Sequence, residues 1–404
     1  MSTPSSYISR AKSFTYELQS LYYENGQGGR VCVELKELGT KRVLVMCRDE
    51  YASYRNVVEF INKLTEAGLR VFNYSVKKKY ASSSDILGAL DVYRGYNCDT
   101  IVVFGGGAEI FCAKLVSAMA VNDMKDPVEA EGFGKIKKDI SVLCCVGTDN
   151  STAISSGVAE FMDENTGRWV TVISNYLVPQ IAVIDTDIAM RTLTNVSIAS
   201  AIDTLAMSIE CLISPVRDYD QAYKACALNA ITLVTDNLLD MKDNPDDGYL
   251  RKKIALAGVY AGTAVRMIGL GVSHLIIHAM KTRFGPEYGD YYFRVLRQYI
   301  NIYYDSIRDD LAEVYDKIIK DEVRPGYAVM NGIPEPRFSA EDSATAMIEL
   351  LDELYVAALP ESQEIPPISK KDIHSIFEEI KVSAAEFGFA KLDEASVTRV
   401  LEGL

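Results

Sequence analysis

Two of the three histidines in this 404-residue chain lie close together, in the segment GVSHLIIHAM. His274 and His278 are spaced i, i+4, so a helix would present both imidazoles on one face. Asp203, in SAIDTLAMSIE, is a candidate to join them from another helix. Imidazole and carboxylate groups bind both Zn²⁺ and Fe²⁺, so these residues could hold a divalent metal. Alternatively, both histidines are hydrogen-bonded core residues, and the sequence leaves both interpretations open.

A second stretch that could do chemistry is DTIVVFGGGAEIFCAK, residues 99–114. The apolar residues 101–104 are typical of a buried strand, and helix-compatible residues follow the three glycines Gly105, Gly106 and Gly107. This order predicts a strand, a phosphate-binding turn and a helix whose free N–H groups face an anion. Glycines also occur in such turns for steric reasons alone, so the motif by itself does not decide between the two.

Composition limits the classes of function. The formal net charge of −14 argues against a nucleic-acid partner, which would need a basic face. We find neither the pattern of a signal peptide nor an apolar run of about 18 residues, so we expect a cytoplasmic protein without a membrane partner. The eight cysteines show no CxxC spacing and are expected to be reduced core residues.

The segments that must position these residues change character near the middle of the chain. Strand-like and helix-like segments alternate up to Asp185, which indicates parallel βαβ units. We also expect an edge strand or hairpin near residues 31–33. Strands are predicted at residues 41–46, 69–74, 101–104, 140–146, 169–173 and 181–184. Later segments are helical, at residues 196–213, 218–240, 249–280, 290–320, 341–357 and 370–381.

We therefore predict two domains. Residues 1–187 would form an α/β nucleotide-binding domain, and residues 188–404 would form an all-helical domain. The cleft between them is the expected site, because strand ends and helix faces can converge there on a ligand.

With these motifs the chain resembles the iron-containing alcohol dehydrogenase family, whose fold is dehydroquinate synthase-like. FGGGAEIFCAK stands for the family's GGGSxxDxAK, AIDTLAMSIE for GxDALxHAxE, and LGVSHLIIHAM for GxxHAxxH. DENTG at residues 163–167 and LVPQIAVID at 177–185 match further family motifs. The resemblance implies a dinucleotide-binding α/β domain, an all-α C-terminal domain, and an NAD(P)-dependent oxidoreductase of small alcohols or carbonyl compounds. We also expect a homodimer.

The resemblance also shows departures at the metal site. Relatives bind a divalent metal through one Asp and three His; Asp203 and His274 keep two of these positions, and Met207 and Tyr288 replace the other two. Because thioether and phenol are poor ligands for these metals, tight metal binding is not expected. His278 matches a histidine that moves protons in relatives, so we expect His278 and Tyr288 to be catalytic. Alternatively, Met207 and Tyr288 only fill an abandoned site.

The cofactor side departs as well. The resemblance implies that Gly105, Gly106 and Gly107 hold the cofactor together with the residue after them, Ala108, where relatives have serine, and with Thr148. Arg48 stands near the position that holds the adenosine ribose and would favour NADP. A register shifted by one residue would place Asp49 there and favour NAD.

Three hypotheses from different classes remain. The chain is an NAD(P)-dependent oxidoreductase without the family's tight metal, a non-redox enzyme such as a lyase or isomerase, or a pseudoenzyme that binds a partner. We adopt the first, because the glycines, Thr148, Asp203, His274 and His278 are retained. Its partner would be a small-molecule substrate.

Overall fold

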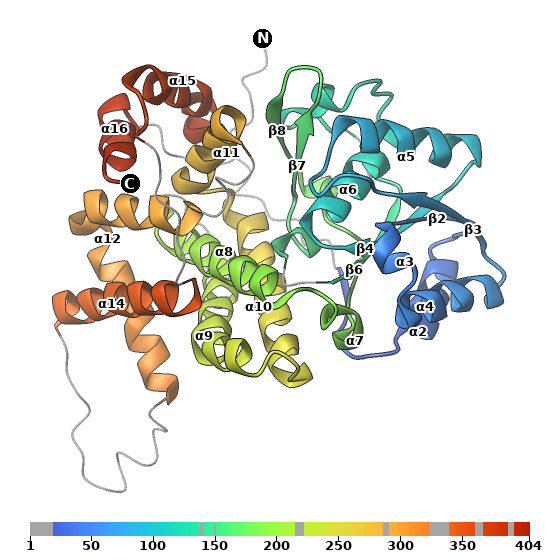
Figure 1. Ribbon diagram of the computed structural model, residues 1–404, viewed down its shortest axis with the longest axis horizontal. Coiled ribbons are helices and arrows are strands. Elements are labelled where there is room, and N and C mark those ends of the chain that lie inside the picture. Colours follow the sequence, from blue (N-terminus) through green and yellow to red (C-terminus); the bar gives the residue numbers. More distant parts are fainter. Residues whose placement is uncertain are drawn as a thin grey trace, which may run out of the picture.

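The computed structural model (Figure 1) describes most of the chain. The described residues are 19–137, 140–148, 151–214, 222–285, 291–322, 339–359, 367–386 and 392–404.

A six-stranded parallel sheet organises the first half of the chain, in the strand order β1-β9-β6-β4-β2-β3. Its strands are β1 (Ser20–Tyr22), β2 (Arg42–Cys47), β3 (Arg70–Ser75), β4 (Thr100–Gly105), β6 (Val142–Gly147) and β9 (Ile181–Ile184). Strand β4 is central and buried along its whole length, as its continuous apolar run predicts.

Helices cover both faces of this sheet (Figure 1). Residues of α2 (Gly28–Glu37) and α4 (Arg55–Glu66) pack on the face that includes Val45 and Val102. Residues of α5 (Ser83–Gly95) and α6 (Gly107–Val121) pack on the face that includes Met46 and Val103. Because the strands are parallel, Gly105 and its partner Gly147 lie side by side at the carboxyl ends of β4 and β6.

A separate three-stranded sheet has the order β5-β8-β7. Strands β7 (Val158–Asp163) and β8 (Arg168–Ile173) form an antiparallel hairpin, and β5 (Gly132–Phe133) pairs with β8. The predicted strand at residues 169–173 is confirmed, but it belongs to this sheet and not to the parallel one. The hairpin register places Glu160 directly opposite Thr171.

The second half of the described chain is helical. Its helices are α8 (Thr194–Leu212), α9 (Ala222–Asp243), α10 (Gly248–Ile268), α11 (Val272–Phe284), α12 (Tyr292–Glu322), α14 (Ala340–Ala358), α15 (Lys370–Glu386) and α16 (Glu394–Glu402). Helices α8 and α10 lie where this half meets the sheets (Figure 1). The arrangement confirms the predicted fold class, an α/β part followed by an all-helical part. The exact boundary after residue 187 stays a prediction.

Two local predictions were wrong. Residues 31–33 are helical and not a strand, because Val31, Cys32 and Leu35 form the buried side of α2; the edge strand is β1. The single helix predicted at residues 249–280 is two helices, which meet at 99°. The chain bends there because Gly269, with φ at +90°, ends α10.

Among the described helices, none is by itself long and apolar enough to cross a membrane, and only the bent pair α10 and α11 passes that test together.

Candidate functional site

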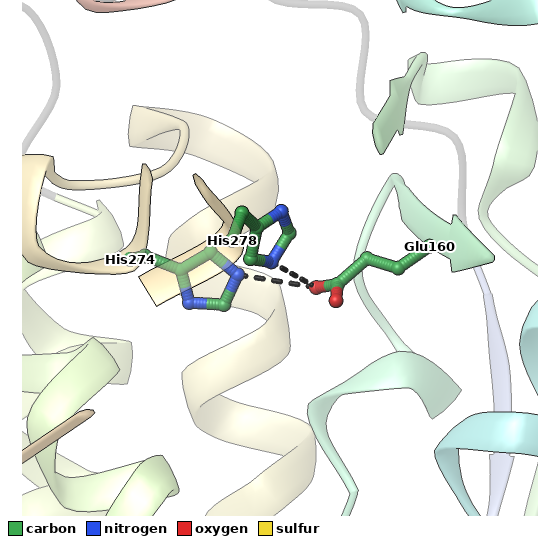
Figure 2. A group of neighbouring side chains, drawn as sticks. All are labelled: Glu160, His274 and His278. Carbon is green, nitrogen blue, oxygen red and sulfur yellow. Dashed lines mark hydrogen bonds and ion pairs between the residues drawn. The ribbon is translucent and has the colours of Figure 1, made fainter. Parts of the chain in front are cut away.

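A carboxylate and two imidazoles meet between β7 and α11 (Figure 2). Oε1 of Glu160 lies 2.7 Å from Nε2 of His278 and 3.2 Å from Nε2 of His274. Glu160 and His278 are buried. We call these three residues the Glu160 cluster. The predicted pairing of the two histidines on one helix face is present, with ring centroids 4.4 Å apart.

The β7–β8 hairpin sets the orientation of His278. Thr171, opposite Glu160 in the hairpin, places its Oγ1 2.5 Å from Nδ1 of His278. This contact turns the other ring nitrogen, Nε2, toward Glu160. Nε2 is buried and forms no aligned hydrogen bond, although Glu160 Oε1 is so close. The hairpin therefore presents a ring nitrogen to the centre of the cluster.

Lys281 completes the surroundings of Glu160. Its Nζ lies 3.6 Å from Oε2 of Glu160, whereas the imidazole contacts are to Oε1, and 5.4 Å from the centre of the Trp169 ring. The two oxygens of Glu160 thus serve different neighbours. The ammonium group is held by a carboxylate and an aromatic face together.

The protonation states follow from burial and charge. Burial raises the pKa of Glu160, but the nearby His278 and Lys281 and the hydrogen bond from His274 outweigh this effect and hold that pKa well below its usual value. Burial lowers the pKa of His278 to about 4, against the opposing effect of Glu160. At neutral pH the cluster therefore contains an ionised carboxylate and a neutral imidazole.

Helix α11 is anchored at its N-terminus by Glu210 of α8. Oε1 of Glu210 accepts a hydrogen bond from the Ser273 N–H at 2.7 Å, and Oε2 accepts one from the Tyr292 hydroxyl at 2.5 Å. The Tyr292 ring then packs edge-on against His274, with centroids 5.2 Å apart. A Cβ at Gly271 would lie 2.2 Å from Cδ of Glu210, so only glycine leaves room for this contact.

The turn between β4 and α6, formed by Gly105, Gly106 and Gly107, is called the glycine turn below. One cavity of about 170 Å³ connects the Glu160 cluster with this turn. Gly107 and Phe111 line it from α6, and Glu160, His274 and Lys281 line it from the opposite part of the chain. A ligand in this cavity would contact both regions.

Asp203 and Met207, which stand at two of the family's metal positions, line this cavity together with His274. Met207 Sδ lies 3.6 Å from the Thr152 hydroxyl. Among the described residues, however, the close group of possible metal ligands consists of Glu160, His274 and His278, whose ligand atoms all lie within 4.8 Å of one another, and Asp203 is not in it. Tyr288, the other predicted catalytic residue, lies outside the described residues.

Sequence reasoning missed Glu160. The available signal was an acidic residue inside the apolar run VAEFMD, where Ala159 and Phe161 are fully buried. A carboxylate at such a position needs a partner, so it marks a candidate site.

The predicted cofactor residues gather where β4 and β6 end. Gly105 ends β4, Gly106 precedes the first turn of α6, and Gly107 begins that helix, followed by Ala108. The Thr148 N–H donates a hydrogen bond to the Gly105 carbonyl at 3.0 Å. The predicted order of strand, glycine turn and helix is therefore present.

Arg48 and Asp49 take different directions at the end of β2. Arg48 Nε lies 2.5 Å from Oε1 of Glu109, the third residue of α6, so Arg48 faces the glycine turn. The Asp49 side chain is 83% exposed, and its carboxylate lies 3.7 Å from Lys77 Nζ. Of the two alternatives, only Arg48 is directed at the predicted cofactor site.

The Glu160 cluster suits a divalent metal. Two imidazoles and one carboxylate form a ligand set known for Zn²⁺ and Fe²⁺. The His278 nitrogen Nε2, buried and without an aligned hydrogen bond, points into the set, and Thr171 orients the ring from its other side. Weak metal binding at Asp203 and His274 alone stays a prediction.

Comparison with known proteins gives matches over most of the chain. A family model described as "Iron-containing alcohol dehydrogenase" matches residues 19–186, and one described as "Fe-containing alcohol dehydrogenase family, C-terminal" matches residues 197–361. The fold is similar to that of a solved 1,3-propanediol oxidoreductase, with a TM-score of 0.80, 18% identity, and coverage of 96% of this chain and 99% of that one.

Two named alcohol dehydrogenases are similar to this chain in sequence. The NAD-dependent methanol dehydrogenase of Bacillus methanolicus is 25% identical over 265 residues, which are 64% of this chain and 68% of that protein. Alcohol dehydrogenase 4 of Schizosaccharomyces pombe is 26% identical over 231 residues, 56% of this chain. The second alignment spans 53% of that relative, about half its length.

Proposed function

Because the chain belongs to the iron-containing alcohol dehydrogenase family, we propose that it is an NAD(P)-dependent oxidoreductase that interconverts a small alcohol and its carbonyl compound. The observation that carries the proposal is the single cavity between the glycine turn and the Glu160 cluster. A nicotinamide bound from the turn would meet a substrate held beside the cluster. That contact is the requirement for hydride transfer.

The size of the cavity supports a small substrate. Its volume of about 170 Å³ is below the roughly 300 to 1,000 Å³ of pockets that take drug-sized ligands. The names of the methanol dehydrogenase and propanediol oxidoreductase relatives are consistent with a substrate of this size.

We propose that Lys281 donates the proton that the reduction of the carbonyl compound takes up. In the reducing direction, the carbonyl carbon receives hydride from the nicotinamide, and the Lys281 ammonium donates a proton from Nζ to the carbonyl oxygen. Glu160 holds this ammonium at 3.6 Å, and His278, fixed by Thr171, holds Glu160. Oxidation of the alcohol reverses both transfers. Lys281 is then a catalytic residue and Glu160 a positioning residue; His278, which we expected to be catalytic itself, would in this assignment act through Glu160, and its direct catalytic role stays a prediction.

A divalent metal, when bound, would be held by Glu160, His274 and His278 and would polarise the substrate oxygen. The expected catalytic role of Tyr288 stays part of the proposal, as a hydrogen-bond donor to the carbonyl oxygen that receives its one proton from Lys281.

Nucleotide binding is the first test. We expect the fluorescence of NADH or NADPH to change on titration with the protein, and we expect the same nucleotide to be consumed with a short-chain aldehyde. No binding of either nucleotide would contradict the proposal and favour a lyase, an isomerase or a pseudoenzyme. The proposal includes a cytoplasmic homodimer, which light scattering after size-exclusion chromatography and cell fractionation would test.

A further inference from the structure

The glycine turn between β4 and α6 already contains a carboxylate. Glu109 is fully buried, and its Oε2 accepts a hydrogen bond from the Gly106 N–H at 2.9 Å. Its Oε1 lies 2.5 Å from Nε of Arg48. A backbone N–H at a helix N-terminus and a guanidinium are the groups that bind phosphate in such turns. Glu109 therefore makes the contacts that a phosphate oxygen would make.

The turn is built around this side chain. A Cβ at Gly105 would lie 2.4 Å from Cβ of Glu109 and 2.5 Å from its Oε2. Only glycine at this position leaves room for the carboxylate. Oε1 of Glu109 and Nε of Arg48 are both buried, and neither forms an aligned hydrogen bond. Their contact is an ion pair, and opening it breaks no aligned hydrogen bond between the two side chains.

We infer that Glu109 competes with the cofactor phosphate for the glycine turn, so that dinucleotide binding requires the Glu109 carboxylate to leave Gly106 and Arg48. The inference rests on the proposed function, because it concerns the same cofactor site. A carboxylate and a phosphate repel each other at contact distance, and they cannot both occupy the Gly106 N–H and the Nε of Arg48. Residue 109 thus sets the cofactor affinity, and Arg48 becomes available to a phosphate only when Glu109 withdraws.

The test compares two glutamates that face the same arginine. Glu109→Gln keeps the shape of the side chain and removes its charge, and we expect the dissociation constant for NADH or NADPH to fall about tenfold or more. Glu50→Gln is the matched control: Glu50 Oε1 lies 3.5 Å from Nη1 of Arg48, and its side chain is 58% exposed. The control also removes one charge near Arg48, but none from the glycine turn, so its effect should stay within about threefold.

Nicotinamide fluorescence titrations of the wild type and both variants give the constants, and thermal unfolding shows whether the variants are folded. Equal effects of Glu109→Gln and Glu50→Gln would overturn the inference, as would no change in either. If Glu109→Gln does not fold, a crystal structure of the wild type with NADPH decides. The inference requires the Glu109 carboxylate to have left the Gly106 N–H, and a bound pyrophosphate beside an unmoved Glu109 would contradict it.

Failure of the proposed function gives a different result. Variants that bind dinucleotide more tightly but reduce no aldehyde would support the inference and contradict the oxidoreductase proposal. Absence of binding in the wild type, in Glu109→Gln and in Glu109→Ala would contradict both.

Discussion

At the scale of single residues, the site combines groups whose individual chemistry is ordinary. Glu160 is the residue that joins them, because its two oxygens contact His274 and His278 on one side and Lys281 on the other. Substitutions of Glu160 therefore test metal binding, and substitutions of Lys281 test proton transfer.

Glu160→Gln should weaken binding of Zn²⁺ or Fe²⁺ by more than about 100-fold, because loss of a ligand exceeds the usual effect of changing an outer-shell partner. Isothermal titration calorimetry measures the metal affinity, and elemental analysis after gel filtration measures the bound metal. Asp203→Asn is the control, since Asp203 is not in the close ligand group. Metal lost from Asp203→Asn and kept by Glu160→Gln would place the metal at the family positions instead. A wild type without metal would contradict a metal site at the Glu160 cluster and agree with the weak binding expected at Asp203 and His274.

Lys281→Met should lower kcat about 10²- to 10³-fold, because the proton donor is removed. Lys281→Arg keeps the ion pair with Glu160 but donates poorly, since arginine holds its proton far above neutral pH. It should fold normally and remain slow, with a changed pH profile of kcat. Full activity of Lys281→Met, measured beside the exposed-lysine control Lys381→Met, would show that the proton comes from elsewhere.

At the scale of elements, α11 carries both histidines, and its position depends on the contact of Glu210 with Ser273. The bend between α10 and α11 gives α11 its own N-terminus, which a buried carboxylate can then cap. A change at the bend should therefore act on stability and on the site together.

Gly271→Ala should destabilise the fold by about 1 to 3 kcal/mol, because the new Cβ displaces the Glu210 carboxylate and leaves the Ser273 N–H without a partner. Urea unfolding measures this free energy. Gly29→Ala in α2 is the control, because no atom lies within 4 Å of its added Cβ. That control should be neutral or up to about 1 kcal/mol more stable. Equal stability of the two variants would refute the capping role of Glu210.

At the scale of the whole molecule, α6 and the small sheet are joined by a buried lysine. Lys114 is fully buried and donates hydrogen bonds to the carbonyls of Ser156 and Val158, at 2.7 and 2.9 Å. Burial lowers the pKa of Lys114 from 10.5 to about 7. Between pH 7 and pH 10.5 the Lys114 side chain therefore binds its proton less in the folded chain than in the unfolded chain.

Between pH 7 and pH 10.5 the unfolded chain holds the Lys114 proton more tightly, so the stability contributed by Lys114 rises with pH there. Relative to Lys114→Met, the wild type should gain about 2 kcal/mol of unfolding free energy from pH 7 to pH 9. In the unfolded chain the cysteines also titrate in this range. Both proteins contain them, so the difference cancels their effect except for that of Cys145, whose pKa Lys114 lowers. Parallel stability curves from chemical unfolding would contradict the assignment.

The sequence by itself determined the features that depend on neighbouring residues. Helical spacing put His274 and His278 on one face, and the apolar run before three glycines specified a strand, a turn and a helix. The alternation of elements and then the run of helices specified the fold class. These patterns are local, so they can be read without knowing how the elements pack.

Which groups meet in the site depends on how distant segments pack. Glu160 reaches His274 across 114 positions of sequence because the β7–β8 hairpin packs against α11. Arg48, expected near the adenosine ribose of the cofactor, forms an ion pair with Glu109 of the glycine turn, because β2 and β4 are neighbours in the sheet. Local periodicity says nothing about such contacts, since they depend on strand order and on the packing of distant elements.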